Sequence, residues 1–533
     1  MEYVRDVIGH PTPRILAWSS TPDARSAVGS YFILMERISG VALEKRWFNT
    51  FDEDIGAVLW EILFLDLDFV LQVNPQLQSR PTEKDSKEPA AGKYRIGPAV
   101  DKQYRFNESV EGDRGPWPDM VSFIQATCRL ALRRAESQAS SPASSSPSPS
   151  SLLTTTIILF TVSTMADSKL FQPINIGDLT LNHRIVLAPL TRYKSTEKGH
   201  VPYTSVMKEY YSQRASDPGT LLITEATLVA QKAGVFKNIP GIWSQEQIDA
   251  WKEVTDAVHA KGSFIFCQLW GQGRGADASH LKDEDASLEY VAPSAIKLSY
   301  TDETPRPLTL DEIHEYPKLF AQAAANAVFK AGFDGVEVNA VNGFLIDQFI
   351  QDVSNKRTDD YGGSVENRAR FPLEVIDAVV DAVGAHRTAF RVSPWNTWQE
   401  MRMEDPIPTF SYLVTKIGQR HTDLAYLHVI EPRVNGTGTR DGVPGAHESN
   451  GFIRELWAPR PLISAGGYTR KLAMQVADEK GGLVAFGRFF ISNPDLPKKL
   501  KKDLPLTPYN SLTFYLHGEV TEGYTDYPFA SEE

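Results

Sequence analysis

Two side-chain amides and one phenyl ring lie close together in the stretch VEVNAVNGFLIDQF, residues 336–349. Asn339 and Asn342 are three positions apart, and Phe344 follows two positions later. An amide N–H can donate to a carbonyl oxygen and polarise it, whereas a phenyl ring has no proton to give. The spacing therefore predicts a site that binds a carbonyl group and lacks a general acid beside it.

Arg391 places a guanidinium inside the apolar run TAFRVSP, residues 388–394. A guanidinium in such surroundings needs an anionic or strongly accepting partner, because it cannot lose its charge. Two interpretations stay open. The partner is either a bound ligand or the carboxylate of Glu225 or Glu337 in a structural ion pair, since both carboxylates lie on other apolar runs.

Gln268 and Trp270 end the apolar run SFIFCQLW, residues 263–270. If this run is a β-strand, the two side chains point to the same side, because side chains alternate along a strand. A large aromatic residue at this place is compatible with plain packing. The amide two residues earlier on the same side favours a polar site inside the fold.

Glycines mark the ends of two later apolar runs, at Gly466-Gly467 and at Gly487-Arg488. Bare backbone N–H groups beside a fixed cation are a common phosphate site in barrel proteins. Glycine alone is compatible with turn chemistry. Glycine at both ends, together with an arginine, favours phosphate binding.

Together these residues favour a cofactor that carries a phosphate and a flat ring with polar edges. The Gln268 amide suits such an edge, as does Thr191, which follows Pro189 and Leu190 at the end of the first apolar run. Arg391 suits an electron-rich end of the ring. Flavin mononucleotide (FMN) meets this description. Pyridoxal phosphate needs a Schiff-base lysine at a strand end, and no candidate strand carries one.

Short apolar runs alternate with longer amphipathic runs from residue 184 onward, which is the pattern of β-strand–α-helix units. The amphipathic runs at 244–262 and 310–332 predict helices, the first with a serine cap and a glycine stop. The expected strands cover residues 184–191, 219–227, 263–270, 334–340, 388–394, 424–432, 460–467 and 482–489.

Eight such units in about 350 residues predict an α/β fold, the (β/α)8 TIM barrel. A doubly wound sheet would show a glycine fingerprint after its first strand, and LAPLTRYKS has none. The GQGRG segment at 271–275 lacks the dinucleotide-binding spacing and predicts a loop.

Composition sets the broad class of protein. The 533 residues carry a net charge of −12 and an ordinary apolar fraction, which argues against nucleic-acid binding. Cys128 and Cys267 are far apart, so neither a disulfide framework nor a metal site is expected. Residues 1–9 lack a signal-peptide pattern, and the apolar run 151–164 is too short to span a membrane. We therefore expect a cytoplasmic protein without membrane contacts.

A Ser/Pro-rich segment at 137–155 cannot form a core and divides the chain. The expected parts are residues 1–136, a linker at 137–164, and an FMN-binding barrel domain at 165–533. The first part resembles a truncated aminoglycoside-phosphotransferase-like (kinase-like) family member in TPRILAWSS and YFILMERISGVAL, which implies that Met35-Glu36 lies at an adenine-binding hinge. Phosphoryl transfer needs an aspartate base and a magnesium-binding aspartate. Neither pattern occurs before residue 165, so this part is expected to be inactive and a bifunctional phosphotransferase–reductase is disfavoured.

Residues 170–528 resemble the old yellow enzyme family of FMN-dependent NAD(P)H oxidoreductases. The similar stretches include LAPLTRYK, EYYSQRAS, QLWGQGR, DQFIQDVSNKRTDDYGGSVENRARF, RVSPW, ISAGGYT and GRFFISNPDLP. The resemblance implies that Thr191 tunes the flavin potential, that Arg391 stabilises the anionic reduced ring, and that Trp270 and Tyr515 line the substrate pocket. It implies FMN contacts from Pro189, Leu190, Thr191, Ala226, Gln268, Arg391, Gly466, Gly467, Gly487 and Arg488.

The family's reaction, by resemblance, uses NADPH or NADH to reduce FMN. The C=C bond of an α,β-unsaturated aldehyde or ketone then accepts hydride from the flavin N5, while two donors hold its carbonyl oxygen and a tyrosine protonates the α-carbon. This sequence departs from the family's residues at two places in the site. Asn339 and Asn342 stand where the family has histidine with asparagine or a second histidine, and Phe344 stands where it has the tyrosine.

Losing a positioned acid typically slows its step by two to four orders of magnitude, although hydride transfer does not need that acid. The favoured prediction is an ene-reductase. The alternatives are a quinone or nitro reductase, which needs no carbon protonation, and a flavin-dependent isomerase that takes the hydride back. Another acid, such as Tyr515 or a tyrosine of the loop after residue 270, also stays open. The protein is expected to be a monomer or a homodimer.

Overall fold

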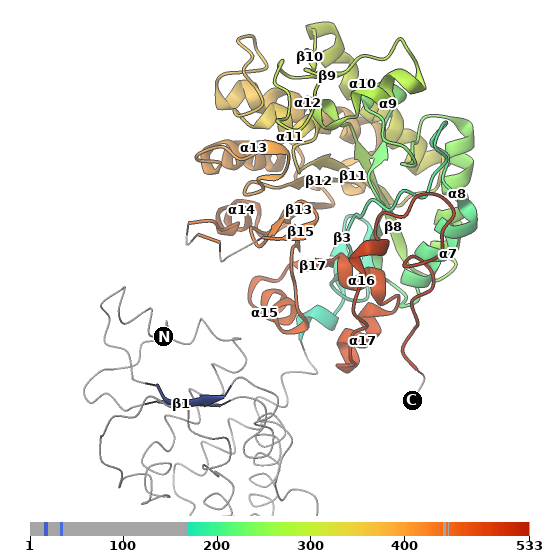
Figure 1. The fold of residues 1–533 in the computed structure, drawn as a ribbon, viewed down its shortest axis with the longest axis vertical. Helices are drawn as coiled ribbons and strands as arrows, with labels where there is room; N and C mark the ends of the chain where they lie inside the picture. The colour runs from blue at the N-terminus through green and yellow to red at the C-terminus, as the bar shows by residue number, and fades with distance from the viewer. Residues whose placement is uncertain (1–14, 20–31, 36–167, 441–443, 446, 532–533) are drawn as a thin grey trace, which may run out of the picture. The chain divides into compact units, whose positions relative to one another are not determined.

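The computed structural model describes residues 15–19, 32–35, 168–440, 444–445 and 447–531 (Figure 1). These residues belong to two units, one within residues 1–160 and one within 161–533. In the first unit, β1 (Ile15–Ser19) and β2 (Phe32–Met35) pair as antiparallel strands. The rest of the phosphotransferase-like stretch and the Ser/Pro-rich segment lie outside the described residues. The kinase-like resemblance and the predicted boundaries therefore stay predictions.

Eight parallel strands of the second unit close into a barrel, which confirms the predicted TIM barrel. Neighbouring strands follow the order β5-β6-β8-β11-β12-β13-β16-β17, and β17 pairs with β5 to close the ring. A short strand, β7 (Thr227–Leu228), adds to β8. The barrel strands are β5 (Ile185–Leu187), β6 (Leu221–Ile223), β8 (Phe264–Trp270), β11 (Gly335–Ala340), β12 (Thr388–Val392), β13 (Tyr426–Ile430), β16 (Leu462–Ala465) and β17 (Leu483–Phe486).

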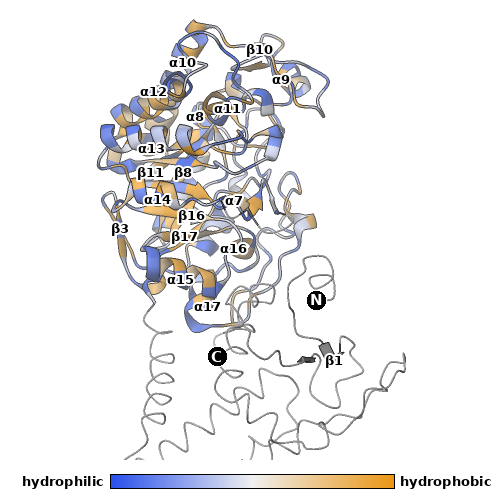
Figure 2. Cartoon of the chain, turned by 90° about the vertical axis from the view of Figure 1, so that its left-hand side faces the viewer, coloured by the Kyte–Doolittle hydropathy of each residue, from blue (hydrophilic) through white to orange (hydrophobic). Residues whose placement is uncertain are grey.

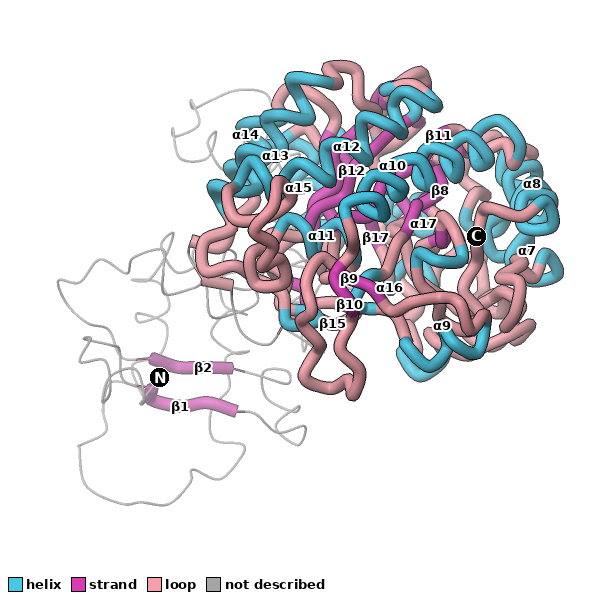
Figure 3. The backbone as a smooth tube through the Cα atoms, turned by 90° about the horizontal axis from the view of Figure 1, so that it is seen from above, coloured by secondary structure: helices cyan, strands magenta, loops and turns pink. Residues whose placement is uncertain are grey.

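Helices surround these strands, as Figure 3 shows in cyan around magenta. The predicted serine cap is present, because Ser244 and Gln247 form a reciprocal capping box at the start of α8. The predicted 310–332 helix forms α10 and continues as a π-helical segment. The main helices are α7 (Thr204–Arg214), α8 (Gln245–His259), α10 (Leu310–Ala325), α11 (Leu345–Ile350), α12 (Val365–Val383), α13 (Ile407–Arg420), α14 (Gly451–Trp457), α15 (Arg470–Lys480), α16 (Arg488–Ser492) and α17 (Leu496–Lys502).

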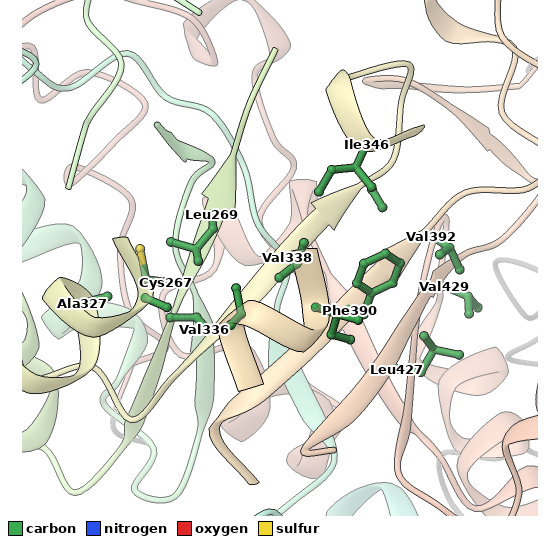
Figure 4. Close-up of a cluster of buried hydrophobic side chains, with 14 of the residues drawn as sticks. Cys267, Leu269, Ala327, Val336, Val338, Ile346, Phe390, Val392, Leu427 and Val429 are labelled. Carbon is green, nitrogen blue, oxygen red and sulfur yellow. The ribbon is translucent and has the colours of Figure 1, made fainter. Parts of the chain in front are cut away.

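Each barrel strand turns one set of alternate side chains outward, toward the helices. Val336 and Val338 of β11, with Phe390 of β12, belong to this outward set and are fully buried (Figure 4). The strands therefore appear as a hydrophobic layer between amphipathic helices in Figure 2. Removing this apolar surface from water is the main force that holds the helices against the barrel.

The other set of alternate side chains points into the barrel, and its polar members lie in neighbouring register. Glu337 of β11 pairs in register with Gln268 of β8. Asn339 pairs with Arg391 of β12, and Arg391 pairs in turn with His428 of β13. Parallel strands bring these side chains to one level near their carboxyl ends. The barrel thus carries a polar layer where barrel enzymes place their chemistry.

Two further predictions concern the GQGRG loop and a membrane-spanning segment. The GQGRG segment does form a connecting segment, in which a short 3-10 turn covers Gly273–Gly275. In the part of the chain that the structure describes, no helix has both the length and the apolar character needed to cross a bilayer.

Candidate active site

A cavity of about 1230 Å³ opens at the carboxyl ends of the barrel strands. Its volume exceeds the few hundred to about 1,000 Å³ that usually hold one drug-sized ligand. A cofactor and a substrate together suit it better. Every site residue predicted from the sequence lines this cavity, namely Pro189, Leu190, Thr191, Ala226, Gln268, Trp270, Asn339, Asn342, Phe344, Arg391, Gly466, Gly467, Gly487, Arg488 and Tyr515.

Arg391 is buried and faces this cavity without a hydrogen bond to its Nε. Among the described residues, neither Glu225 nor Glu337 comes close enough to form the ion pair that the sequence left open. Glu225 accepts a hydrogen bond from the backbone N–H of Arg192 at 3.2 Å. Burial lowers the pKa of Arg391, yet a guanidinium of such high ordinary pKa stays charged. The Arg391 guanidinium therefore has N–H groups available to donate to a bound group.

Glu337 instead takes part in a buried chain of polar groups. His428 Nδ1 lies 2.8 Å from one carboxylate oxygen, and Gln268 Nε2 donates to the other at 2.6 Å. Burial alone would raise the pKa of Glu337, but His428 and Arg391 outweigh it and hold that pKa below its usual value. Burial lowers the pKa of His428. We infer a carboxylate that accepts an N–H from a neutral imidazole, placed close to the Arg391 charge.

Glycine is required by the backbone at the predicted phosphate edge. Gly466 and Gly467 have φ angles of 128° and 62°, a region that side-chain-bearing residues rarely adopt. A Cβ at Gly487 would lie 3.1 Å from a methyl carbon of Leu190. Arg488, at the same edge, donates to the Thr439 hydroxyl at 2.9 Å. Open backbone with a nearby cation suits a phosphate group.

These features fit FMN. A buried guanidinium with an unused N–H matches the electron-rich edge of the ring, and the glycines with Arg488 match the phosphate. Gln268 and Thr191 line the same cavity. FMN, when bound there, supplies hydride transfer.

The two predicted amide donors are each held by hydrogen bonds that leave an N–H available. Asn339 Nδ2 donates to Gln268 Oε1 at 3.0 Å, and its Oδ1 accepts from the Val341 backbone at 3.3 Å. Asn342 Oδ1 accepts a hydrogen bond from Asn396 Nδ2. Because a side-chain amide nitrogen carries two hydrogens, both asparagines retain at least one donor for an oxygen in the cavity.

Phe344 lies against Trp270, with ring centroids 4.6 Å apart at an interplanar angle of 87°. Phe236 is a second aromatic neighbour of Trp270, with centroids 6.1 Å apart and the rings tilted by 55°. The edge-to-face arrangement of Phe344 and Trp270 is favourable for aromatic rings, and the three rings form an apolar side of the cavity. No proton can come from the Phe344 position itself.

Tyrosines reach the cavity from elsewhere. Tyr515 is 43% exposed, and burial of its phenol raises its pKa. The backbone just before it is held by buried Arg192, whose Nε donates to the Phe514 carbonyl at 3.0 Å. Tyr193 stacks on His517 at 4.4 Å, and burial raises its pKa as well. Both phenols stay protonated at neutral pH, so each remains available as a substitute acid.

Sequence reasoning did not single out Asn396, Tyr193 or His428. For His428 a signal existed, because a polar residue stood at an inward-facing position of a predicted strand. Tyr193 and Asn396 follow strands by a few residues, and their position in a loop gave no reason to choose them.

Asp347 accepts a hydrogen bond from the loop that carries Asn342, and it makes the free energy of unfolding depend on pH in a testable way. One carboxylate oxygen accepts the Gly343 N–H at 2.8 Å and the other accepts the Gln351 amide at 2.8 Å, while burial raises the pKa of Asp347 to about 7. The native state therefore holds a proton that the unfolded state has released above about pH 4. The stability that the protonated Asp347 contributes to the native state is complete below about pH 4 and is lost as the pH rises through about 7.

We expect the D347N variant to remove this pH-dependent loss of stability, because asparagine has no proton to release. Between about pH 4 and about pH 7, the free energy of unfolding should fall less steeply in D347N than in the wild type, by up to about 1.4 kcal/mol per pH unit. Urea unfolding followed at several pH values measures the slope. The exposed Asp311 of α10 provides the matched control, D311N. Equal slopes for D347N and the wild type would contradict the prediction.

A closed parallel barrel with a cation and a glycine-lined edge at its carboxyl end defines a barrel enzyme that binds a phosphate-bearing cofactor. The chain belongs to the NADH:flavin oxidoreductase / NADH oxidase family, whose sequence pattern matches residues 169–507. The protein is therefore an NAD(P)H-dependent flavin oxidoreductase that uses FMN, as predicted.

Individual relatives support the same assignment. The chain is 49% identical over 369 residues to the chanoclavine-I aldehyde reductase fgaOx3 of Penicillium roqueforti, which covers 68% of this chain and 97% of that protein. It is 47% identical over 377 residues to the probable inactive reductase easA of Epichloe festucae var. lolii, covering 69% of this chain and 97% of that protein.

Solved structures agree with the fold. The Old Yellow Enzyme from Pichia sp. AKU4542 superposes with a TM-score of 0.63 at 39% identity, covering 69% of this chain and 95% of that one. Morphinone reductase gives a TM-score of 0.62 at 38% identity, covering 68% and 97% of the two chains. Morphinone reductase has also been solved in complex with tetrahydroNAD. The resemblance to old yellow enzymes is thus confirmed in sequence and in fold.

Proposed function

We propose that this protein reduces the C=C bond of α,β-unsaturated aldehydes or ketones, with NADPH or NADH as the source of electrons. The observation that carries this proposal is the pair of asparagine amides, each fixed by its neighbours and each with a free N–H in the cavity. Relatives named as aldehyde reductases support an aldehyde as substrate. The proposal keeps Pro189, Thr191, Gln268, Arg391 and the glycine-lined edge as cofactor contacts.

The amide pair acts on the substrate carbonyl. Two neutral N–H donors draw electron density toward the oxygen and make the β-carbon more electrophilic. The aromatic side formed by Trp270, Phe344 and Phe236 excludes water and orients an apolar substrate beside the donors. Arg391 keeps a positive charge at the buried end of the cavity, where negative charge on a bound ring is stabilised.

Protonation of the α-carbon is the step for which the chain supplies no group at position 344. Water or a phenol would then deliver the proton. Tyr193 and Tyr515 line the same cavity, as do Tyr290 and Tyr300 of the loop after β8. A positioned acid raises the rate of such a step by about two to four orders of magnitude. We therefore expect slow C=C reduction in the wild type.

A second candidate function follows from the same phenylalanine. If the proton arrives slowly, the enolate left after hydride addition has time to rotate about its Cα–Cβ single bond. Loss of hydride from the β-carbon would then restore the C=C bond in the other geometry, and the net result is double-bond isomerisation. Quinones and nitro compounds form a further alternative, since their reduction places protons on oxygen. The apolar contact between Phe344 and Trp270 favours these outcomes by keeping donors away from the α-carbon.

An anaerobic mixing experiment with the full chain separates these functions. The protein is bleached with NADPH or NADH and mixed with 2-cyclohexenone, a quinone or a nitro-aromatic, while flavin absorbance and products are followed together. Return of absorbance with cyclohexanone formed in equal amount supports the proposal. Return with the quinone or nitro compound alone contradicts it. An open-chain cis-enal tests the isomerase, because the ring of 2-cyclohexenone prevents rotation about its C=C bond: formation of the trans-enal without return of absorbance identifies an isomerase.

A further inference from the structure

Asn396 lies directly behind Asn342 in the loop that follows β12. It is only 2% exposed, and it is absent from the residues that line the cavity. Its Oδ1 accepts a hydrogen bond from the backbone N–H of Trp398 at 2.8 Å. A backbone N–H can only donate, so this contact identifies which end of the Asn396 amide is oxygen. The opposite end, facing Asn342, must be the NH2 group.

The orientation of Asn396 fixes the orientation of Asn342. Since Asn396 presents a donor, Asn342 must meet it with Oδ1, and its own NH2 group is left for the cavity that it lines. The Asn342 backbone is held by the same loop. Its N–H donates to Ser393 Oγ at 3.0 Å, and its carbonyl accepts from Gln399 Nε2 at 3.0 Å. Asn342 also has a φ of 58°, so this loop stabilises a backbone conformation that few residues adopt.

The other amide donor is oriented separately. The carboxylate of Glu337 can only accept, so Gln268 turns its NH2 group toward it and offers Oε1 to Asn339. Asn339 must then direct Nδ2 toward Gln268, and its Oδ1 is held by the Val341 N–H. A change at Asn396 therefore alters the orientation of Asn342 and leaves that of Asn339 in place.

We propose that Asn396 is a positioning residue that sets which end of the Asn342 amide faces the substrate oxygen. It does so without touching substrate or cofactor. This inference rests on the proposed function, in which Asn342 holds the carbonyl oxygen. Replacing Asn396 by a residue that accepts instead of donating should turn the Asn342 amide around and present an oxygen to the substrate.

The variants N396D and N396A test this inference. In N396D the carboxylate still accepts the Trp398 N–H but now accepts from Asn342 as well, which leaves Asn342 Oδ1 toward the cavity. In N396A nothing dictates the orientation, so the correct one remains available. Asn435 gives a matched control, since its Oδ1 accepts the Thr397 N–H at 3.1 Å and it does not line the cavity.

Binding of 4-nitrophenol to the oxidised, FMN-loaded full chain is the readout, measured from the perturbation of flavin absorbance. A hydrogen bond to a charged oxygen is worth enough to predict a Kd raised roughly tenfold or more in N396D. N396A should show a smaller rise, and N435D should match the wild type. FMN content should stay unchanged in N396D because the two side chains have nearly the same shape, whereas the melting temperature should fall because the new carboxylate is buried.

The ranking of N396D and N396A by their Kd for 4-nitrophenol distinguishes a positioning role of Asn396 from a packing role. If Asn396 only fills space, N396A leaves a gap and is the more damaged, while N396D binds the phenol like the wild type. That order overturns the inference, as does equal binding by all variants or a wild type that does not bind the phenol. Failure of the proposed function looks different. In that case the wild type binds the phenol with the expected order among variants but yields no saturated ketone.

Discussion

The F344Y variant is expected to form saturated ketone about a hundred to ten thousand times faster than the wild type, if protonation limits the wild-type reaction. Phe344 lines the cavity beside the two amide donors and lies edge-to-face on Trp270. A hydroxyl on its ring would enter the same space and place an O–H donor there. The backbone and the ring need not move, so the gain comes from the added proton donor.

Steady-state turnover of 2-cyclohexenone, with product measured directly, gives the comparison. The matched control is F236Y, which adds the same hydroxyl to the other phenylalanine that contacts Trp270. F236Y should gain far less rate than F344Y, because its hydroxyl does not stand at position 344, where the family has its acid. If F344Y is no faster, the wild type already has an acid in place, and Tyr193 or Tyr515 becomes the residue to replace.

The second large effect concerns Arg391. We expect R391Q to raise the Kd for FMN roughly thirtyfold or more, because truncating one partner of a buried charged contact typically costs several kcal/mol. Arg391 lines the cavity and makes no ion pair within the described residues, and its buried Nε has no hydrogen-bond partner. The guanidinium is therefore available to the cofactor. Release of FMN on dilution, followed by flavin fluorescence, measures this loss.

The double variant R391Q/E337Q distinguishes cofactor binding from structural support. In R391Q alone the Glu337 carboxylate loses a nearby compensating charge, which should also lower the melting temperature of the apoprotein. Adding E337Q removes that buried charge and should restore stability. FMN binding should stay weak in the double variant and should be stronger in E337Q alone, which shares any effect on the Gln268 amide. If binding returns together with stability, Arg391 serves Glu337 and not the cofactor.

The barrel could be predicted from the sequence because the patterns that mark its strands and helices involve residues close together in the chain. All eight strands lie within the predicted runs, since alternating apolar residues such as Val336 and Val338 bury one side of a strand. The capping box at Ser244 was equally readable, because it depends on residues only three positions apart. Residues at strand ends were brought into one cavity for a similar reason, as parallel strands all end on the same side of a barrel.

What the sequence lacked was information about contacts between loops. Asn396 meets Asn342 only because two loops converge above the barrel, and no periodicity encodes that approach. The ion pair considered for Arg391 does not form because Glu337 is already engaged by Gln268 and His428. That competition depends on the register of three strands.

The pairing of β17 with β5 has a consequence for how the enzyme comes into being. Val484 is the register partner of Ile185, so the last barrel strand to leave the ribosome completes the ring begun by the first. Long-range closure of this kind is slow, because a long loop must be ordered before its contacts form. The edge formed by Gly487 and Leu190 exists only after that closure. A nascent chain that has not yet exposed β17 should therefore be unable to capture FMN, so cofactor loading is a late event in folding.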